Sequence, residues 1–151
     1  MPPDPRVLVL NGPNLNLLGR REPAVYGTTT LADVEALSLA AAREHGLTLD
    51  FRQSNHEGVL IDAVQEAGRE MDAIVINAGG YTHTSVALRD ALAAAGLPVV
   101  EVHLTNIHRR EPYRRHSYVS EVADALICGA GPNGYALALA HAAVLLKKEG
   151  R

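Results

Sequence analysis

The sequence predicts a single α/β domain built on a doubly wound, five-stranded parallel sheet with helices on both faces. Short runs rich in leucine and β-branched residues alternate with alanine-rich helical runs along the chain, which is typical of parallel α/β folds. The run DAIVINAGG (72–80) is almost wholly apolar, as expected for a central strand covered on both faces. With 151 residues, 47% of them hydrophobic, the chain can build one domain over residues 1–151 but not two.

The first strand and the first helix have clear local signals. The run RVLVLN (6–11) is short and apolar, and it forms the first predicted strand. Residues 30–46 predict a helix, because Thr30 and Asp33 form a candidate capping box and a glycine follows as a stop. The helical face is expected to carry Leu31, Val34, Leu37, Leu39 and Ala41.

The remaining elements continue the alternation. Strands are predicted at 47–53, 72–80, 97–104 and 124–129, helices at 57–71, 83–96 and 134–149, and an arginine-rich loop with some helix at 105–122. Five strands and about five helices fit a flavodoxin-like, three-layer α/β/α sheet of order 2-1-3-4-5, in which ligands bind at the carboxyl ends of the strands. That rule selects four loops as candidate sites, at 11–27, 77–83, 101–105 and 109–116.

Composition argues against several classes of protein. The net charge is −3, no apolar run approaches the ~20 residues of a membrane helix, and the start MPPDPR lacks the features of a signal peptide. We therefore expect a cytoplasmic protein with neither nucleic-acid nor membrane partners. The single cysteine, Cys128, argues against an internal disulfide or thiolate zinc site and is expected to be a small buried residue. The only lysines, Lys147 and Lys148, lie together in the last helix, so a Schiff-base lysine is not expected.

The loop 11–27 is long for a strand-to-helix connection and carries Asn14, Arg20, Arg21 and Tyr26. The simplest interpretation is a turn with solvated arginines. Alternatively, an arginine lowers the pKa of the Tyr26 phenol. Moving that pKa from about 10 to near 7 requires about 4 kcal/mol, which one or two close guanidinium groups in a dry pocket can supply. Tyr26 is thus a candidate general base.

The segment NAGGYTHTS (77–85) follows the third predicted strand. Asn77 ends that strand, and Gly79 allows the backbone to approach a ligand closely. A helix that starts near His83 would suit an anion or a polar ligand. Since Asp90 comes seven positions after His83, two turns of one helix would place both on the same face. A structural histidine and a surface aspartate are an equally good interpretation.

Glu101 and His103 lie two residues apart in the predicted strand 97–104, so both side chains point to one face at its carboxyl end. A buried carboxylate beside a histidine holds its tautomer and favours its protonated form, as in a general acid. A metal site with His103, His108 and Glu101 as ligands is the competing hypothesis. No His-x-x-x-His helix or further carboxylate cluster supports it.

The segment HRREPYRRHS (108–117) carries Arg109, Arg110, Arg114 and Arg115. Solvated surface arginines are the simplest interpretation. RNA binding has little support, because the chain has neither an aromatic platform nor a basic total charge. Arginines, amides and histidines that converge on one crevice would instead suit a small anion with a carboxylate and several hydroxyls.

Four segments, in this order, resemble type II 3-dehydroquinate dehydratases (type II dehydroquinases): NGPNLNLLGRREPAVYG, INAGGYTHTSVALRDAL, VEVHLTNIHRREPYRRHS and GAGPNGY. The resemblance runs from about Arg6 to the last helix. It implies a flavodoxin-like lyase of the shikimate pathway, which leads to chorismate and the aromatic amino acids. Such enzymes convert 3-dehydroquinate to 3-dehydroshikimate by a reversible anti elimination of water through an enolate. They need no metal or organic cofactor and usually form dodecamers built from trimers.

The resemblance also implies catalytic roles. Tyr26 would be the proton acceptor, and Arg21 would keep it ionised, on a hinged lid formed by the loop that follows the first strand. Asn14 would stabilise the enolate oxygen through a water molecule. His103, held by Glu101, would donate a proton to the departing hydroxyl.

Further residues would bind the substrate. Backbone amides at Leu104 and Thr105 would bind its carboxylate, and Arg110 would be a lid arginine. The complete implied set is Asn77, Gly79, His83, Asp90, Leu104, Thr105, Arg110 and Arg114, in which Asp90 reaches the site of a neighbouring subunit.

Two functions of other classes are the alternatives. A flavodoxin-like binding module would hold flavin or a phosphate in the same crevice, although NGPN lacks the hydroxyl-rich phosphate turn of flavodoxins. A metal-dependent hydrolase would use His103 and His108.

Overall fold

The computed structural model describes residues 2–20, 24 and 27–150 of the chain. The described strands form one sheet and are β1 (Arg6–Asn11), β2 (Thr48–Gln53), β3 (Ala73–Asn77), β4 (Val99–His103) and β5 (Ala125–Cys128). Their order is β2-β1-β3-β4-β5, and every neighbouring pair is parallel. The predicted flavodoxin-like sheet and its strand order are therefore confirmed.

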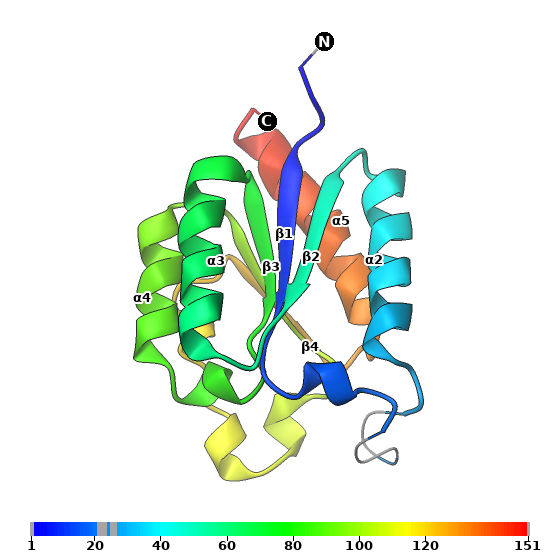
Figure 1. Cartoon of the computed structure of the whole chain (residues 1–151), viewed down its shortest axis with the longest axis vertical. Helices are drawn as coiled ribbons and strands as arrows, with labels where there is room; N and C mark the ends of the chain where they lie inside the picture. Colours follow the sequence, from blue (N-terminus) through cyan, green and yellow to red (C-terminus); the bar gives the residue numbers. More distant parts are fainter. Residues whose placement is uncertain (1, 21–23, 25–26, 151) are drawn as a thin grey trace.

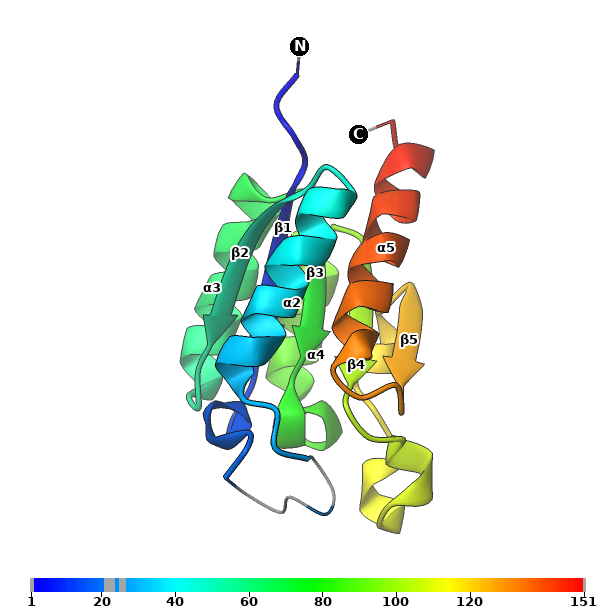
Figure 2. The ribbon, with the colours of Figure 1, turned by 90° about the vertical axis from the view of Figure 1, so that its right-hand side faces the viewer.

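Helices cover both faces of this sheet (Figures 1 and 2). The long helices are α2 (Leu31–Glu44), α3 (Glu57–Glu70), α4 (Val86–Ala95) and α5 (Asn133–Lys148). Residues of β1 alternate between two apolar cores, with Val7 and Val9 packed on the side of α2 and α5, and Leu8 and Leu10 on the side of α3 and α4. This double burial explains why the central strands are apolar at almost every position.

Helix α2 confirms the predicted capping box but differs in one core residue. The Thr30 side chain accepts a hydrogen bond from the Asp33 backbone N–H, and the Asp33 carboxylate accepts one from the Thr30 N–H. Leu39, expected on the core-facing side, is 43% exposed. The buried stripe instead runs through Val34 and Ser38, four residues apart, which turns the next position toward solvent.

The segments that follow β1, β3 and β4 gather at one end of the molecule, opposite both termini (Figure 1). Much of this end is built from short 3₁₀ helices: η1 (Leu15–Leu17), η2 (Gly79–His83), η3 (Ile107–Arg109), η4 (Pro112–Arg114) and η5 (Val119–Glu121). The prediction of loop with some helix over 105–122 is confirmed. The sheet thus presents the predicted loops at its carboxyl edge, where this fold class binds ligands.

Cys128 is only half-buried, because it ends β5, an edge strand, so the prediction of a small buried residue is wrong.

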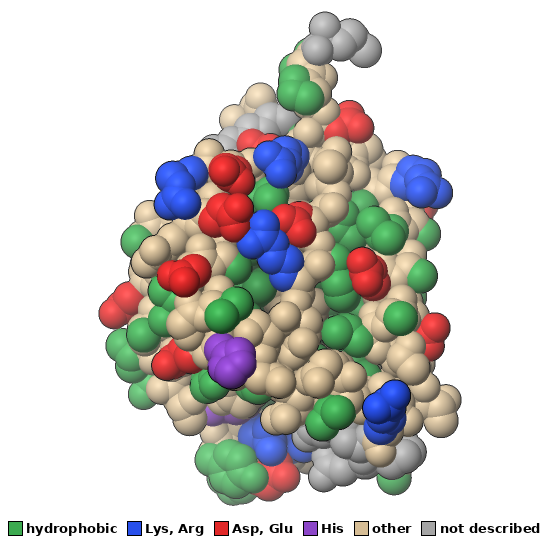
Figure 3. Space-filling view, viewed as in Figure 1, with side chains coloured by type: hydrophobic (Ala, Val, Ile, Leu, Met, Phe, Trp, Pro, Cys, Tyr) green, Lys and Arg blue, Asp and Glu red, His purple; other side chains and the backbone are tan. Residues whose placement is uncertain are grey.

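Figure 3 shows cationic and acidic side chains interspersed on the face viewed in Figure 1. Arg52 lies 2.7 Å from Asp50 and 2.6 Å from Glu66. Within the described part of the chain, no helix combines the length and the apolar character that crossing a bilayer requires.

Candidate functional site

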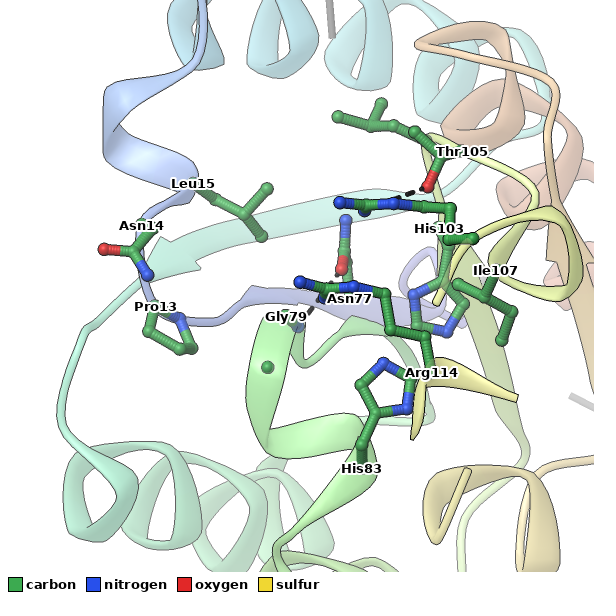
Figure 4. Close-up of a pocket in the computed structure, with 13 residues that line it drawn as sticks. Pro13, Asn14, Leu15, Asn77, Gly79, His83, His103, Thr105, Ile107 and Arg114 are labelled. Atoms are coloured by element: carbon green, nitrogen blue, oxygen red, sulfur yellow. Dashed lines mark hydrogen bonds between the residues drawn. The ribbon is translucent and has the colours of Figure 1, made fainter. Parts of the chain in front are cut away.

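A cavity opens at the carboxyl ends of β1, β3 and β4 (Figure 4). Its volume is about 150 Å³. The described residues that line it are Pro13, Asn14, Leu15, Asn77, Gly79, Gly80, His83, His103, Leu104, Thr105, Ile107, Arg110 and Arg114. The cavity therefore brings together most of the described residues that the sequence singled out, from four separate segments.

Glu101 and His103 form a buried pair beside this cavity. The His103 Nε2 atom lies 2.5 Å from Oε2 of Glu101, and the two side chains are 7% and 1% exposed. The same carboxylate oxygen accepts a hydrogen bond of 2.7 Å from the Ser117 hydroxyl, and the Ser120 hydroxyl donates to Oε1. The prediction that Glu101 and His103 share one face of the strand is confirmed, while the two serines were missed.

These hydrogen bonds set the charge of Glu101. Burial by itself would raise its pKa, but the hydrogen bonds from His103 and the two serines hold the pKa below the ordinary glutamate value. Glu101 is therefore a carboxylate at neutral pH, and it accepts the proton on His103 Nε2. The other ring nitrogen, Nδ1, is then the one that can act on a ligand in the cavity.

The same geometry bears on the alternative metal site. Nε2 of His103 is committed to Glu101, and His108 is exposed on η3. Among residues 2–20, 24 and 27–150, no three His, Cys, Asp or Glu side chains are grouped so that they could hold a metal ion. The proposed ligand set of His103, His108 and Glu101 is thus not assembled in this structure.

His83 lines the cavity from η2 and has a defined tautomer. Its Nδ1 lies 2.8 Å from the backbone carbonyl of His116, and since only an N–H can bond to a carbonyl, Nδ1 carries the proton. Burial lowers the pKa of His83 below the ordinary histidine value, although the carbonyl by itself raises it. Positive charge on His103 and Arg114 lowers the pKa further. In the neutral ring, Nε2 is an acceptor suited to a ligand hydroxyl.

Asp90 does not share a helix with His83, so that prediction is wrong. Helix α4 begins only at Val86, because the Ser85 side chain caps it by accepting a hydrogen bond of 2.9 Å from the Leu88 N–H. His83 ends η2, which is a separate element. The Asp90 side chain is 63% exposed, lies 3.1 Å from Arg89 and is not part of the cavity lining.

The turns after β1 and β3 pack directly against each other. A Cβ atom at Gly12 would lie 2.3 Å from the backbone oxygen of Ala78, so only glycine fits there. Gly79 has a φ of 58°, which favours glycine. Asn14 also has a positive φ, of 70°, and its N–H donates to the Asn55 side chain. This close packing holds Asn14 and Gly79 at the cavity wall.

Two arginines supply positive charge at the cavity. The Arg114 Nε lies 2.6 Å and the Arg110 Nε 3.8 Å from one oxygen of Glu111, so a carboxylate links them. Arg110 also donates to the Thr105 hydroxyl at 3.4 Å. Arg109 is not among the lining residues. Of the arginines in this segment, those at 110 and 114 are the ones that a bound anion would meet.

Two of the predicted catalytic residues, Arg21 and Tyr26, lie outside the described residues. Leu104 and Thr105 directly follow β4 and line the cavity. Sequence reasoning missed Tyr135, whose hydroxyl is hydrogen-bonded to Asn77 at 3.0 Å. The segment GAGPNGY contains this tyrosine, but its place in an alanine-rich apolar helix made it indistinguishable from an ordinary core residue.

Comparison with known proteins gives consistent matches over nearly the whole chain. The family model described as dehydroquinase class II matches residues 5–143. A 3-dehydroquinate dehydratase of Azorhizobium caulinodans is 62% identical over 131 residues, which cover 87% of this chain and 88% of the relative. Catabolic 3-dehydroquinase 1 of Aspergillus terreus is 56% identical over 142 residues, which cover 94% and 93%.

Solved structures agree with these matches. The type II dehydroquinase of Propionibacterium acnes superposes with a TM-score of 0.90 at 41% sequence identity, covering 95% of this chain and 99% of that one. A 3-dehydroquinate dehydratase-like protein of Bifidobacterium longum superposes with a TM-score of 0.71 at 29% identity, covering 95% and 98%. Together with the family model, these matches establish that the chain belongs to the class II dehydroquinase family.

Proposed function

We propose that this chain is a 3-dehydroquinate dehydratase, which removes water from 3-dehydroquinate to give 3-dehydroshikimate, the third step of the shikimate pathway. The buried Glu101–His103 pair beside a small polar cavity is the observation that carries the proposal. The names of the relatives from Azorhizobium caulinodans and Aspergillus terreus support it. The asparagine, histidine and arginine side chains that line this cavity suit a small polar compound.

The polar groups of the cavity match such a substrate, which has one carboxylate and several hydroxyls. Arg110, Arg114 and the backbone amides at Leu104 and Thr105 can bind the carboxylate and a ring hydroxyl. Neutral His83 can accept a hydrogen bond from a hydroxyl at Nε2. Asn77 and Gly79 line the facing wall and belong to the same proposed binding set.

His103 is proposed as the general acid. With both ring nitrogens protonated, Nε2–H donates to Glu101, and the Nδ1 proton passes to the hydroxyl that leaves as water. The imidazole of His103 is then neutral and still hydrogen-bonded to the Glu101 carboxylate. Glu101 therefore stays anionic throughout and stabilises the positive charge of the protonated ring.

The base of the proposed reaction is Tyr26. Its phenolate would take the proton from the carbon next to the ketone, and the C–O bond to the leaving hydroxyl would break from the resulting enolate, on the opposite face of the ring. Arg21 would keep Tyr26 ionised, and Asn14 would stabilise the enolate oxygen through a water molecule. The roles of Tyr26 and Arg21 rest on the family resemblance, because both residues lie outside the described part of the chain.

The decisive experiment is a turnover assay with purified protein and 3-dehydroquinate, without added cofactor and after exhaustive dialysis against a chelator. We expect formation of the conjugated enone, followed by its ultraviolet absorbance. Borohydride added with the substrate should not inactivate the enzyme, since no imine forms. Absence of the enone, or activity that needs a metal, would refute the proposal.

We also propose that the chain assembles into a dodecamer of trimers in which Asp90 reaches a neighbouring subunit's site. The strong exposure of Asp90, outside its own subunit's cavity, supports such a role. Light scattering should give the mass of twelve chains, and Asp90→Asn should lower activity more than the control Asp62→Asn, another exposed aspartate. A monomer with full activity would contradict the assembly and the role of Asp90 together.

A further inference from the structure

Tyr135 lies in the first turn of α5 and is completely buried. Asn11 and Asn77, the last residues of β1 and β3, are neighbours in the sheet register. The Tyr135 hydroxyl lies between their side chains, 2.6 Å from Asn11 Oδ1 and 3.0 Å from Asn77 Nδ2. Burial raises the pKa of Tyr135 far above its ordinary value, so the hydroxyl keeps its single proton.

The hydrogen bonds around this hydroxyl allow only one arrangement of donors and acceptors. Asn11 Nδ2 donates to the backbone carbonyl of Arg52 at 3.1 Å, so the carbonyl end of the Asn11 amide must face Tyr135. Tyr135 donates its single hydroxyl proton to Asn11 Oδ1, so the Tyr135 oxygen can only accept a second hydrogen bond. Asn77 must therefore turn its NH₂ group to Tyr135.

The opposite end of the Asn77 amide is fixed as well. Its Oδ1 accepts a hydrogen bond of 3.2 Å from the backbone N–H of Gly79. If the amide were flipped, two acceptors would meet at Tyr135 and two donors at Gly79, and each buried mismatch is costly. One proton of the NH₂ group and one lone pair of Oδ1 remain for the cavity that Asn77 lines (Figure 4).

We infer that Tyr135 is a positioning residue for substrate binding. It acts through Asn77, because it fixes the orientation of the Asn77 side-chain amide and thereby decides where a bound substrate meets the NH₂ group and where it meets Oδ1. The inference rests on the proposed function and adds a residue that does not touch the substrate itself. A ring hydroxyl of the substrate then meets a hydrogen-bond donor and an acceptor at fixed positions. The Asn77 amide does not have to change its orientation on binding.

The sequence before Tyr135 explains how the hydroxyl reaches the sheet. A Cβ atom at Gly134 would lie 3.2 Å from a methyl group of Val102, so glycine lets the start of α5 approach β4 closely. The Tyr135 N–H donates to the carbonyl of Pro132 at 3.1 Å, which closes the first turn. The motif PNGY (132–135) thus combines a turn, a close approach and the buried hydroxyl.

The test is a double-mutant cycle on KM and kcat for 3-dehydroquinate. Tyr135→Phe keeps the ring and removes only the hydroxyl, and we expect a loss of kcat/KM of about tenfold, carried mainly by KM, from the unsatisfied and misdirected amides. The matched control is Tyr118→Phe, whose ring packs edge-to-face against His116, and it should keep the wild-type KM.

In an Asn77→Ala background, Tyr135→Phe should change kcat/KM by less than about twofold, because the residue through which it acts is gone. A purely structural tyrosine would instead lower kcat/KM by the same factor in both backgrounds, and that result would overturn the inference. An unchanged KM in Tyr135→Phe would overturn it too.

Asn11→Ala provides the same test if Tyr135→Phe does not fold. It removes the acceptor of the Tyr135 proton, so the hydroxyl can either donate to Asn77 Oδ1 or accept from the Asn77 NH₂ group, and both amide orientations become possible. The KM defect should again appear and again vanish with Asn77→Ala. Failure of the inference alone leaves an active wild-type enzyme, whereas a wild-type protein without turnover refutes the proposed function and this inference with it.

Discussion

His103 Nε2 lies 2.5 Å from the buried carboxylate of Glu101, and both side chains point to the same face of β4. A buried carboxylate is costly unless its oxygens are hydrogen-bonded. Here the imidazole and two serine hydroxyls provide those bonds. The fold can therefore keep the Glu101 carboxylate buried beside the cavity without leaving its oxygens unpaired.

Glu101→Gln removes this charge while keeping the side-chain shape. We expect kcat to fall about 100-fold, because the amide no longer stabilises a protonated His103. KM should change little, since Glu101 does not line the cavity. Glu66→Gln, at a partly exposed ion pair with Arg52, is the control and should retain full activity. Equal kcat values in the two variants would remove Glu101 from the mechanism.

Ser117→Ala and Ser120→Ala test the support of the carboxylate. The pKa of Glu101 in the folded state lies below its ordinary value of 4.5, so this group stabilises the fold above that pH and the stabilisation is lost as pH falls through the folded pKa. Each serine variant raises the folded pKa. We expect unfolding free energies lower by about 1.5 kcal/mol at pH 7 and acid midpoints at higher pH.

Urea unfolding measured between pH 3 and pH 7 checks this expectation. The difference between each variant and the wild type should shrink as the solution becomes more acidic, because the protonated carboxyl gains less from the hydroxyls. A difference that stays constant over the whole range would show that the serines stabilise the fold by packing alone.

His83 gives a prediction for the pH dependence of binding. Its pKa lies below the ordinary histidine value of 6.5, so the ring is neutral at pH 7 and Nε2 accepts a hydrogen bond. As pH falls through the folded pKa, Nε2 becomes a donor, and we expect KM to rise. His83→Asn should have a raised KM that no longer changes in this range, whereas His45→Asn, an exposed control, should keep the wild-type profile.

Gly12→Ala tests the close packing of the two turns. The added Cβ would lie 2.3 Å from the Ala78 oxygen, and relief requires the backbone to move. We expect a loss of about 3 kcal/mol in unfolding free energy together with a raised KM. Gly58→Ala is the matched control, since nothing lies within 4 Å of its Cβ in α3. That variant should be more stable by about 0.5–1 kcal/mol. Equal stabilities in the two variants would argue against the steric account.

Tyr26→Phe and Arg21→Lys test the proposed base. We expect Tyr26→Phe to lose nearly all turnover while still binding the substrate, as measured by calorimetry. Arg21→Lys should also be strongly impaired despite its unchanged charge, because an ammonium lacks the geometry of a guanidinium. Near-normal turnover in either variant would remove that residue from the proposed mechanism.

The parts of the fold and site that sequence predicted are those with a local signal. Short runs of leucine and β-branched residues predicted the strands, and a spacing of two residues placed Glu101 beside His103. The helical spacing of His83 and Asp90 was misleading, because Ser85 caps a new helix between them. A short polar residue inside a helical pattern gives little warning of such a break.

The sequence pattern could not predict hydrogen-bond partners that lie far apart in the chain. Tyr135 and Asn11 are 124 residues apart, and neither carries a signal that names the other. The same holds for Ser117 and Ser120, which reach Glu101 from a different segment. These residues are recognised only once the sheet order is known, since that order decides which side chains meet.

The place of Tyr135 in the chain has a consequence for biosynthesis. Helix α5 follows every other described element of the site, so a growing polypeptide exposes Asn11 and Asn77 at the ribosome before their shared hydroxyl has been translated. Until then the two amides have no buried donor and acceptor between them. Asn11 and Asn77 therefore acquire the hydroxyl that they share only when α5 docks, however early the sheet itself has begun to form.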